Sequence, residues 1–207
     1  MTKVLEKTER RLGEKLFLKG ERCLGPKCAV ARRAYPPGVH GKNRRRRRES
    51  SEFGSLLREK QKMRFIYGLD DGDVKRYTEK AASARGIFGV ALMRLLESRL
   101  DNVVFRLGFA SSRRLARQLV NHGHVLVNSR MVTIPSYSVR KDEVIALKET
   151  TKKSSLFSEL DSRLKKHIPP VWLARDEGRK GKVVGEVMPE GNEILLDITK
   201  IKEFYSR

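Results

Sequence analysis

Between residues 51 and 100, apolar side chains recur at the spacing of an α-helix. Within each of three stretches they stand three, four or seven residues apart, which places them on one helical face. The first helix begins from Ser51, Asp70 or Asp71 can cap the second, and Gly68 and Gly86 can end them. Helix by helix, the apolar faces are Leu56, Met63 and Tyr67; Val74, Tyr77 and Ala81; and Leu92, Leu96 and Leu100. They predict a small helical domain.

From Ser98 onward the pattern is mixed. Two short helices, each closed by a glycine, precede short β-branched runs, and a turn at Asn128-Ser129 joins the first two runs into a hairpin. Apolar runs after Pro170 predict more strands in the tail. In chain order, the expected elements are helices over 102–107 and 112–121 and strands over 124–127, 131–134 and 144–147.

The first fifty residues show no sustained helical or strand period. They are basic and are interrupted by glycine and proline, which predicts an extended, loop-rich arm. The arm ends in a block of like charge that is typical of an interaction tail. Its members are Arg44, Arg45, Arg46, Arg47 and Arg48.

The net charge narrows the class of partner. Lys and Arg number 46 against 25 Asp and Glu, which gives +21 at pH 7. A compact protein with this charge repels itself, so a polyanion such as RNA or DNA is expected to neutralise it. A membrane partner is disfavoured, because no apolar run approaches the roughly 20 residues of a spanning helix. Two cysteines and the lack of a leader pattern at the N-terminus predict a cytoplasmic protein.

The helix expected after Ser112 has the composition of a nucleic-acid contact. Arg113, Arg117 and Gln118 return to one side of it, where they can straddle phosphates; the alternative is a solvated helix face. Aromatic residues are only 7% of the chain, and Phe53 and others lie within apolar stripes, which favours core packing over base stacking. We therefore expect RNA to be recognised by shape and phosphate.

Metal-binding and catalytic motifs are weak. Cys23 and Cys28 provide half of the four donors that a structural zinc site requires. Glu6, Glu9 and His40 are further donors, although carboxylates suit such a site less well than thiolates. We prefer two free thiols to zinc. The four histidines have no hydrolase, phosphate-loop or dinucleotide-binding context, which argues against those classes of enzyme.

A series of short motifs runs in order along nearly the whole chain. They are LKGERC at 18–23, PKC at 26–28, YPPG at 35–38, LREKQK at 57–62, LLESRLDNVV at 95–104, ARQLV at 116–120, HGH at 122–124 and EFYSR at 203–207. Together these motifs resemble the bacterial ribosomal protein S-four family. Single motifs mean little, but the ordered series is specific.

The resemblance implies an α+β protein in three parts. They are an extended basic arm (1–50), a small helical domain (51–97 with 187–207) and an inserted S-four RNA-binding domain with a helix-turn-helix and an antiparallel sheet (98–186). It also implies a structural constituent of the small ribosomal subunit, with no reaction and no cofactor. Such a protein is a primary binder of the 5′ domain of small-subunit ribosomal RNA, where it nucleates assembly of the body, contacts ribosomal protein S-five, borders the messenger RNA entry channel and contributes to accuracy.

We expect two sets of basic and polar residues to contact RNA. The arginine block 44–48 is expected at the messenger entry channel. The residues expected to bind ribosomal RNA are Lys42, Arg58, Lys60, Lys62, Arg64, Arg99, Arg106, Arg113, Arg114, Arg117, Gln118, His122, His124 and Arg130.

The chain departs from the family pattern in two places that matter here. Glu6 and Glu9 stand where many members have a CxxC pair, which puts the zinc of those members in doubt. Asn128-Ser129 replaces the usual Asn-Gly, which predicts a less relaxed hairpin turn.

Two other functions remain as alternatives. One is an RNA-modifying enzyme that carries an S-four domain, but the residues outside 98–186 are too few for a separate catalytic domain. The other is a general nucleic-acid chaperone, which leaves the ordered motifs unexplained.

Overall fold

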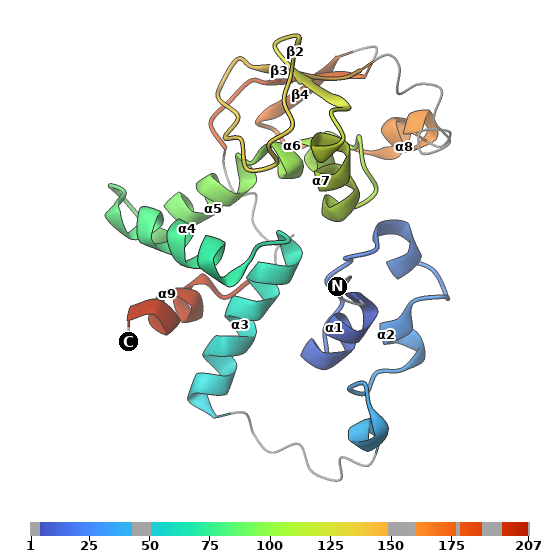
Figure 1. The fold of residues 1–207 in the computed structure, drawn as a ribbon, viewed down its shortest axis with the longest axis vertical. Helices are drawn as coiled ribbons and strands as arrows, with labels where there is room; N and C mark the ends of the chain where they lie inside the picture. The colour runs from blue at the N-terminus through green and yellow to red at the C-terminus, as the bar shows by residue number, and fades with distance from the viewer. Residues whose placement is uncertain (1–4, 43–50, 149–159, 177–178, 188–195, 207) are drawn as a thin grey trace. The chain divides into compact units, whose positions relative to one another are not determined.

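The computed structural model describes residues 5–42, 51–148, 160–176, 179–187 and 196–206 (Figure 1). The arginine block, Arg44, Arg45, Arg46, Arg47 and Arg48, lies outside the described residues. None of the described helices is long and apolar enough to cross a membrane.

Contacts within the chain divide it into two units, which we describe separately. Unit 1 consists of Met1–Lys80 and Ile194–Arg207, and unit 2 of Ala81–Glu193. The domain boundaries expected from the sequence, at 50, 97 and 186, stay predictions. Helices together with a small antiparallel sheet confirm the α+β class.

Short helical segments order the N-terminal arm in unit 1. They are α1 (Leu5–Leu12), a 3₁₀ turn (Gly20–Cys23), α2 (Ala29–Arg32) and a second 3₁₀ turn (Val39–Gly41). The sequence predicts no helix here. The reason for the difference is that Glu9, which is only 1% exposed, takes the inward position of α1, so apolar spacing does not reveal this helix.

Two helices from opposite ends of the chain pack against each other in unit 1, α3 (Glu52–Ile66) and α9 (Ile198–Ser206) (Figure 1). The Ser51 side chain caps α3 by accepting a hydrogen bond from the Gly54 amide at 3.2 Å. Leu56 and Met63 of α3 are buried, and so is Ile201 of α9. The first predicted helix is therefore confirmed.

Two aromatic side chains are more exposed than predicted. Phe53 is 53% exposed, and its ring centroid lies 5.7 Å from that of Phe204. In α4 (Asp71–Ser83), Tyr77 is only half-buried, and Thr78 takes the inward position one turn after Val74. The Thr78 hydroxyl donates to the Val74 carbonyl at 3.0 Å, which satisfies the polar group that burial removes from water.

The apolar stripe predicted for one helix up to Leu100 is buried in unit 2, but two helices carry it. Arg99 is extended and forms an isolated β-bridge with Ser138, and the Val139 amide donates to the Ser98 carbonyl at 2.8 Å. These strand-like bonds break the helix. The helices of this unit are α5 (Phe88–Glu97), α6 (Leu100–Arg106), α7 (Arg113–Asn121) and α8 (Leu160–Lys166).

The strands of unit 2 form one antiparallel sheet in the described part of the chain. The order is β2-β1-β3-β5-β4, and the predicted returning strand 131–134 is shorter than expected. One face of the sheet packs on α6 and α7 (Figure 1), so closely that a Cβ at Gly181 would lie 2.5 Å from Leu107 Cδ2. The strands are β1 (Val125–Val127), β2 (Arg130–Met131), β3 (Val144–Leu147), β4 (Leu173–Asp176) and β5 (Lys180–Val183).

The β1–β2 turn has the geometry that normally requires Asn-Gly. Asn128 has φ of 48° and Ser129 has φ of 66°, both in the left-handed region. Asn128 fits because its side-chain oxygen accepts from the Val144 amide at 2.9 Å and its own amide donates to the Val144 carbonyl at 2.8 Å. Ser129 therefore bears the strain that a glycine would avoid.

Candidate nucleic-acid interface

The outward side of α7 is polar and basic. The Ser112 hydroxyl caps the helix by accepting from the Leu115 amide at 3.3 Å. Ala116, Leu119 and Val120 are buried and fix the helix on the sheet. This anchoring leaves Arg114, Gln118 and Asn121 exposed and Arg117 half-buried. The exposed side of α7 therefore differs from the side predicted to carry Arg113, Arg117 and Gln118, because Arg113 points partly inward.

The chain continues this surface beyond the end of α7. Gly123 has φ of 69°, and a Cβ there would lie 2.9 Å from Met131 Sδ, so the β2 side chain covers this turn. On either side of the glycine, the rings of His122 and His124 are stacked with centroids 6.2 Å apart. Arg130 is exposed on β2.

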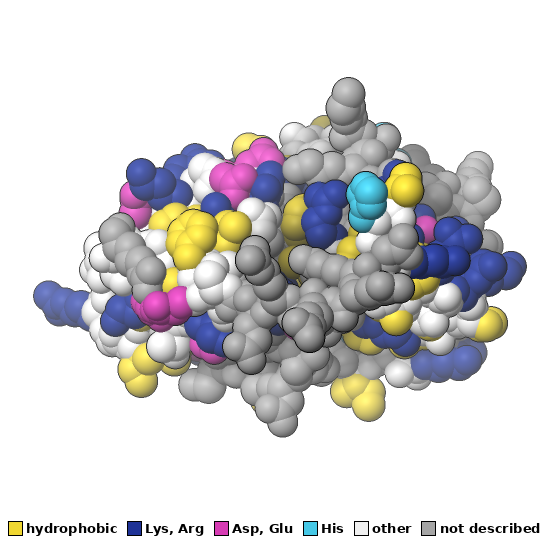
Figure 2. All heavy atoms as spheres, turned by 90° about the horizontal axis from the view of Figure 1, so that it is seen from below, with side chains coloured by type: hydrophobic (Ala, Val, Ile, Leu, Met, Phe, Trp, Pro, Cys, Tyr) yellow, Lys and Arg dark blue, Asp and Glu magenta, His cyan; other side chains and the backbone are white. Residues whose placement is uncertain are grey.

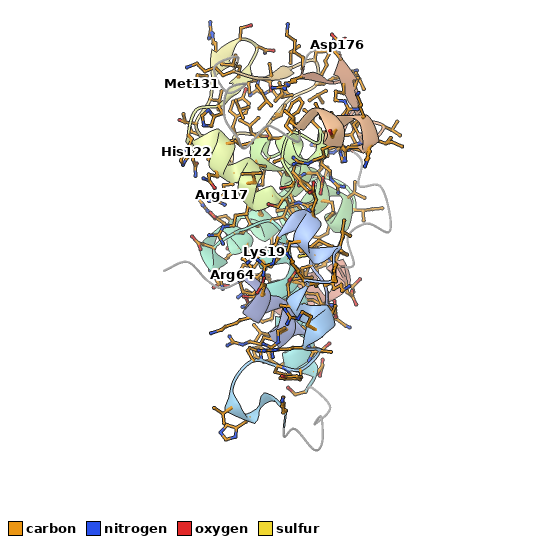
Figure 3. All side chains as sticks on the ribbon, turned by 90° about the vertical axis from the view of Figure 1, so that its right-hand side faces the viewer. Lys19, Arg64, Arg117, His122, Met131 and Asp176 are labelled. Atoms are coloured by element: carbon orange, nitrogen blue, oxygen red, sulfur yellow. The ribbon has the colours of Figure 1, made fainter. Side chains whose placement is uncertain are left out.

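We call the set Arg114, Arg117, Gln118, His122, His124 and Arg130 the α7 surface. It joins side chains from α7, from the turn after it and from the hairpin (Figure 3). The packing of Met131 on Gly123 fixes the hairpin against the helix end. This surface offers cationic groups and an amide donor, which suit contacts to a phosphate backbone.

Arg106 and Arg113, both expected to bind RNA, surround a buried carboxylate. Glu97 is 2% exposed, and its two oxygens accept from Arg106 Nε at 2.9 Å and Nη2 at 3.2 Å. Asn102 Nδ2 donates to Glu97 Oε2 at 2.7 Å, and Arg113 Nε donates to the side-chain Oδ1 of Asn102 at 2.7 Å. This network links the end of α5 to α6 and to the start of α7, and so positions the α7 surface.

Other cations predicted to contact RNA also have acidic partners within the chain. Arg99 is 2% exposed, and its Nη2 lies 2.6 Å from Asp101 Oδ2. Lys60 and Arg64 both pair with Asp71, at 2.9 and 2.8 Å. Three helices meet there, because Asp71 belongs to α4 and Lys60 Nζ also lies 4.9 Å from the ring of Phe204 in α9. Arg99, Lys60 and Arg64 therefore each have a structural role as the partner of a carboxylate within the chain.

Lys62 is buried in a chain of charges. Its Nζ lies 2.7 Å from Glu59 and 2.7 Å from Glu14 of the arm, and these hydrogen bonds help to raise its pKa although burial, the largest effect, lowers it. The second oxygen of Glu59 accepts from the Asp197 amide just before α9, at 3.2 Å. The arm, α3 and the C-terminal helix are therefore tied together at Lys62.

Two predicted contacts in unit 1 are open to solvent. Arg58 is exposed on α3, and Lys42 is exposed in the arm with Nζ 5.8 Å from the Tyr35 ring centroid. Arg10 organises this part of the arm, since its Nε donates to the carbonyls of Arg33 and Tyr35, each at 3.1 Å. Lys and Arg side chains cover more of the face drawn in Figure 2 than Asp and Glu do.

The candidate zinc ligands Cys23, Cys28 and Glu9 in the described part of the arm are buried and suited to other roles. Cys23 and Cys28 are buried free thiols, and burial raises the pKa of the Cys23 thiol, which disfavours the thiolate that zinc requires. Glu9 Oε1 already accepts from the amides of Leu18 and Leu16, at 3.1 and 3.2 Å. Among the described residues, no group of three or more His, Cys, Asp or Glu could hold a metal ion.

Glu6 is committed as well. Its Oε1 lies 3.1 Å from Lys19 Nζ and 3.3 Å from Arg22 Nη2, and Figure 3 shows where Lys19 lies in the arm. Burial raises the pKa of Glu9, while the two amide hydrogen bonds oppose that effect. The two glutamates therefore serve the arm as hydrogen-bond and ion-pair partners, and the residues present do not fit zinc.

The acidic half of these networks was not predicted from the sequence. Glu97, Asp101 and Asn102 are almost fully buried, yet they stand in the apolar run 95–104 where charged residues are rarely found unpaired. The location of these residues within an apolar run was therefore a sequence signal for buried ion pairs. A buried carboxylate requires a cationic partner, so nearby arginines could have been divided between carboxylate and phosphate.

Comparison with known proteins shows to which class of protein the chain belongs. Residues 2–97 match the model of the ribosomal protein S4/S9 N-terminal domain, and residues 98–145 match the S4 domain. Proteins called small ribosomal subunit protein uS4 from Syntrophomonas wolfei, Thermus thermophilus and Acetivibrio thermocellus are 49%, 48% and 50% identical to the chain. Each alignment covers 96% of this chain and 94% of the relative.

The fold, the basic α7 surface and the two matching models define a ribosomal protein with an RNA-binding S4 domain. More narrowly, the chain belongs to the small ribosomal subunit protein uS4 family, which confirms the resemblance found in its motifs. Members of this family are structural proteins of the small subunit, not enzymes, and need no cofactor. In bacteria that subunit is cytoplasmic.

Proposed function

We propose that this protein binds small-subunit ribosomal RNA through the α7 surface. The observation that carries the proposal is the exposed cluster of Arg114, Gln118, His122 and Arg130 on a helix and hairpin that buried packing holds in place. Cations on a rigid frame can match the spacing of phosphates along an RNA strand. Gln118 adds an amide that can bond a 2′-hydroxyl, the group that distinguishes RNA from DNA.

The buried and partly buried cations of unit 2 have a supporting role in this proposal. Arg99, Arg106 and Arg113 orient the elements that carry the α7 surface, because each is bonded to an acidic or amide side chain within unit 2. Arg58 and Lys42 offer a second set of exposed cations in unit 1. We therefore place direct phosphate contacts on the exposed set and leave the buried set to structure.

The double substitution Arg114→Gln and Arg130→Gln tests the α7 surface. Each lost phosphate contact removes roughly 0.7–0.9 from the slope of log affinity against log salt, so the double variant should flatten the slope by roughly 1.4–1.8. The matched control is Arg94→Gln, which removes an exposed arginine paired with Glu186 in the same unit. An unchanged slope in the double variant would show that the α7 surface faces solvent.

We also infer a place in assembly of the subunit. The resemblance implies binding early to the 5′ domain, nucleation of the body and a contact with ribosomal protein S-five that affects accuracy. Support comes from the family and from the two sets of exposed cations in units 1 and 2, which suit a protein that joins several RNA helices. If the inference is right, the Arg114 and Arg130 variant should delay incorporation of later body proteins in reconstitution from purified components. Normal order and rate of incorporation would contradict it.

The arginine block is proposed to contact messenger RNA at the entry channel. Five consecutive arginines exceed what one RNA-docking loop requires, and the family position lies near that channel. Replacing Arg44 to Arg48 by Gln should slow translation through a stable hairpin more than translation of unstructured message. Equal slowing of both templates would mean that the block makes ordinary contacts with ribosomal RNA.

A further inference from the structure

Two of the most exposed apolar side chains of unit 2 lie three residues apart. Ile168 and Val171 are each 88% exposed, and Pro169 and Pro170 between them are half-buried. A residue before proline is restricted to extended conformations, and an extended polyproline helix has three residues per turn. Three residues thus bring such a chain round by about one turn, and the residues at 168 and 171 are exposed whereas the two prolines between them are half-buried.

Both ends of the segment are fixed to the core. On one side, His167 Nε2 lies 2.7 Å from the Arg106 carbonyl, and the imidazole lies so close to Gly108 that a Cβ there would be 2.7 Å from its Cδ2. On the other side, the Leu173 amide donates to the Pro170 carbonyl at 2.9 Å, and Trp172 is buried. The two aliphatic side chains are thus presented in a fixed arrangement, which lowers the entropy cost of binding.

The surroundings of the segment are cationic. Lys165 and Lys166, in the last turn of α8 immediately before it, are both exposed. RNA could satisfy these lysines, but phosphates and riboses gain nothing from β-branched aliphatic side chains. A protein surface with an apolar pocket and an acidic rim satisfies both features, since the pocket removes the side chains from water and the rim pairs with the lysines.

We propose that the segment 168–171 is a docking site for another protein of the small subunit, one with an acidic rim around an apolar pocket. Ile168 and Val171 fill the pocket. Lys165 and Lys166 pair with the rim. The proposal rests on membership of the ribosome but not on the α7 surface, so the two can fail separately.

Photo-crosslinking within purified small subunits tests the proposal. A photoreactive phenylalanine analogue replaces Val171 in the full-length protein, and the same analogue replaces Ile87, which is 76% exposed in the same unit, as the matched control. The expected product is an adduct from position 171 with one other protein of the subunit, at a peptide that contains acidic and apolar residues. An adduct with ribosomal RNA, an adduct with a second copy of this chain, or no adduct would overturn the proposal.

Substitution measures the contribution of the two side chains. Ile168→Ser with Val171→Ser should reduce the yield of that protein in subunits washed at high salt, since loss of each apolar contact weakens binding by about tenfold. The fluorescence of the only tryptophan, Trp172, should be unchanged, which shows that the segment is still folded. Affinity for isolated ribosomal RNA should also be unchanged. A parallel loss of RNA affinity, or full retention of the partner, would contradict protein docking.

Discussion

Replacing Glu9 by alanine should loosen the arm, whereas replacing it by glutamine should not. Glu9 Oε1 accepts hydrogen bonds from two backbone amides that follow α1, those of Leu16 and Leu18. Alanine removes the acceptor and leaves both amides without it. Glutamine keeps an oxygen in the same place and removes the negative charge.

The magnitude follows from burial. The Leu18 hydrogen bond is buried and the Leu16 bond is partly buried, and an amide left unsatisfied in such positions costs about 1–3 kcal/mol. Alanine also relieves the cost of burying a carboxylate, which offsets part of the loss. The net destabilisation of unit 1 by Glu9→Ala should therefore be about 1–3 kcal/mol, and Glu9→Gln should stay within about 1 kcal/mol of the original protein.

The pH dependence separates charge from hydrogen bonding. Burial raises the pKa of Glu9 above its ordinary value of 4.5, so the folded arm holds this proton more tightly than the unfolded chain does. Its contribution to stability is complete below pH 4.5 and is lost as pH rises through the raised folded pKa. The stability of Glu9→Gln relative to the original protein should accordingly increase over that window.

Amide hydrogen exchange of the full-length protein is the direct assay. Exchange at Leu18 should accelerate in Glu9→Ala and stay close to the original rate in Glu9→Gln, while amides in β3 of unit 2 serve as the internal reference. Unchanged protection of Leu18 in the alanine variant would refute a structural role for the carboxylate. A glutamine variant as loose as the alanine variant would show that the charge is required.

Three further substitutions or measurements test other parts of the structure. Ser129→Gly should raise stability in calorimetry by about 0.5–1 kcal/mol, because glycine adopts the left-handed turn without strain; a decrease would contradict this. Glu97→Ala should lower the free energy of unfolding in urea by about 3–5 kcal/mol, since it leaves buried cations unpaired. The control Glu186→Ala, at an exposed position, should lower it by less than about 1 kcal/mol. Similar losses in the two variants would argue against the buried network. Elemental analysis of the purified protein should find no stoichiometric zinc. About one zinc per chain, lost when Cys23 and Cys28 are replaced by serine, would reverse the conclusion on metal fit.

The helices were predictable where burial follows apolar spacing. Leu56 and Met63 of α3 and the buried stripe ending at Leu100 have the period of a helix, so sequence alone was sufficient. The break at Arg99 was not predictable from that stripe, because strand-like hydrogen bonds with residues about forty positions away decide it. Glu9 hid α1 for a related reason, since a buried carboxylate looks like a surface residue in a hydrophobicity pattern.

The candidate site was predictable in composition but not in role. Arginine is the same in sequence whether it binds phosphate or a buried carboxylate, and only the fold shows that Arg106 reaches Glu97 nine positions earlier. Arg114 differs from Arg113 by one position, yet the rotation of α7 exposes the first and turns the second toward Asn102. Each residue advances the helix by about 100° of rotation. A predicted polar face is not placed accurately enough around the helix to tell which of two neighbouring arginines is exposed.

The packing of α9 on α3 has a consequence for synthesis of the chain. Unit 2 is one continuous stretch, whereas unit 1 combines residues that precede unit 2 with residues that follow it. During translation the N-terminal part of unit 1 emerges first, yet Ile201, which packs against α3, is made only after the whole of unit 2. Unit 2 can therefore finish folding while α3 still lacks its C-terminal partner. Unit 1, whose synthesis begins first, therefore completes its folding last. A nascent chain that stalls before α9 is made would have a folded unit 2, the RNA-binding domain, and an incompletely folded unit 1.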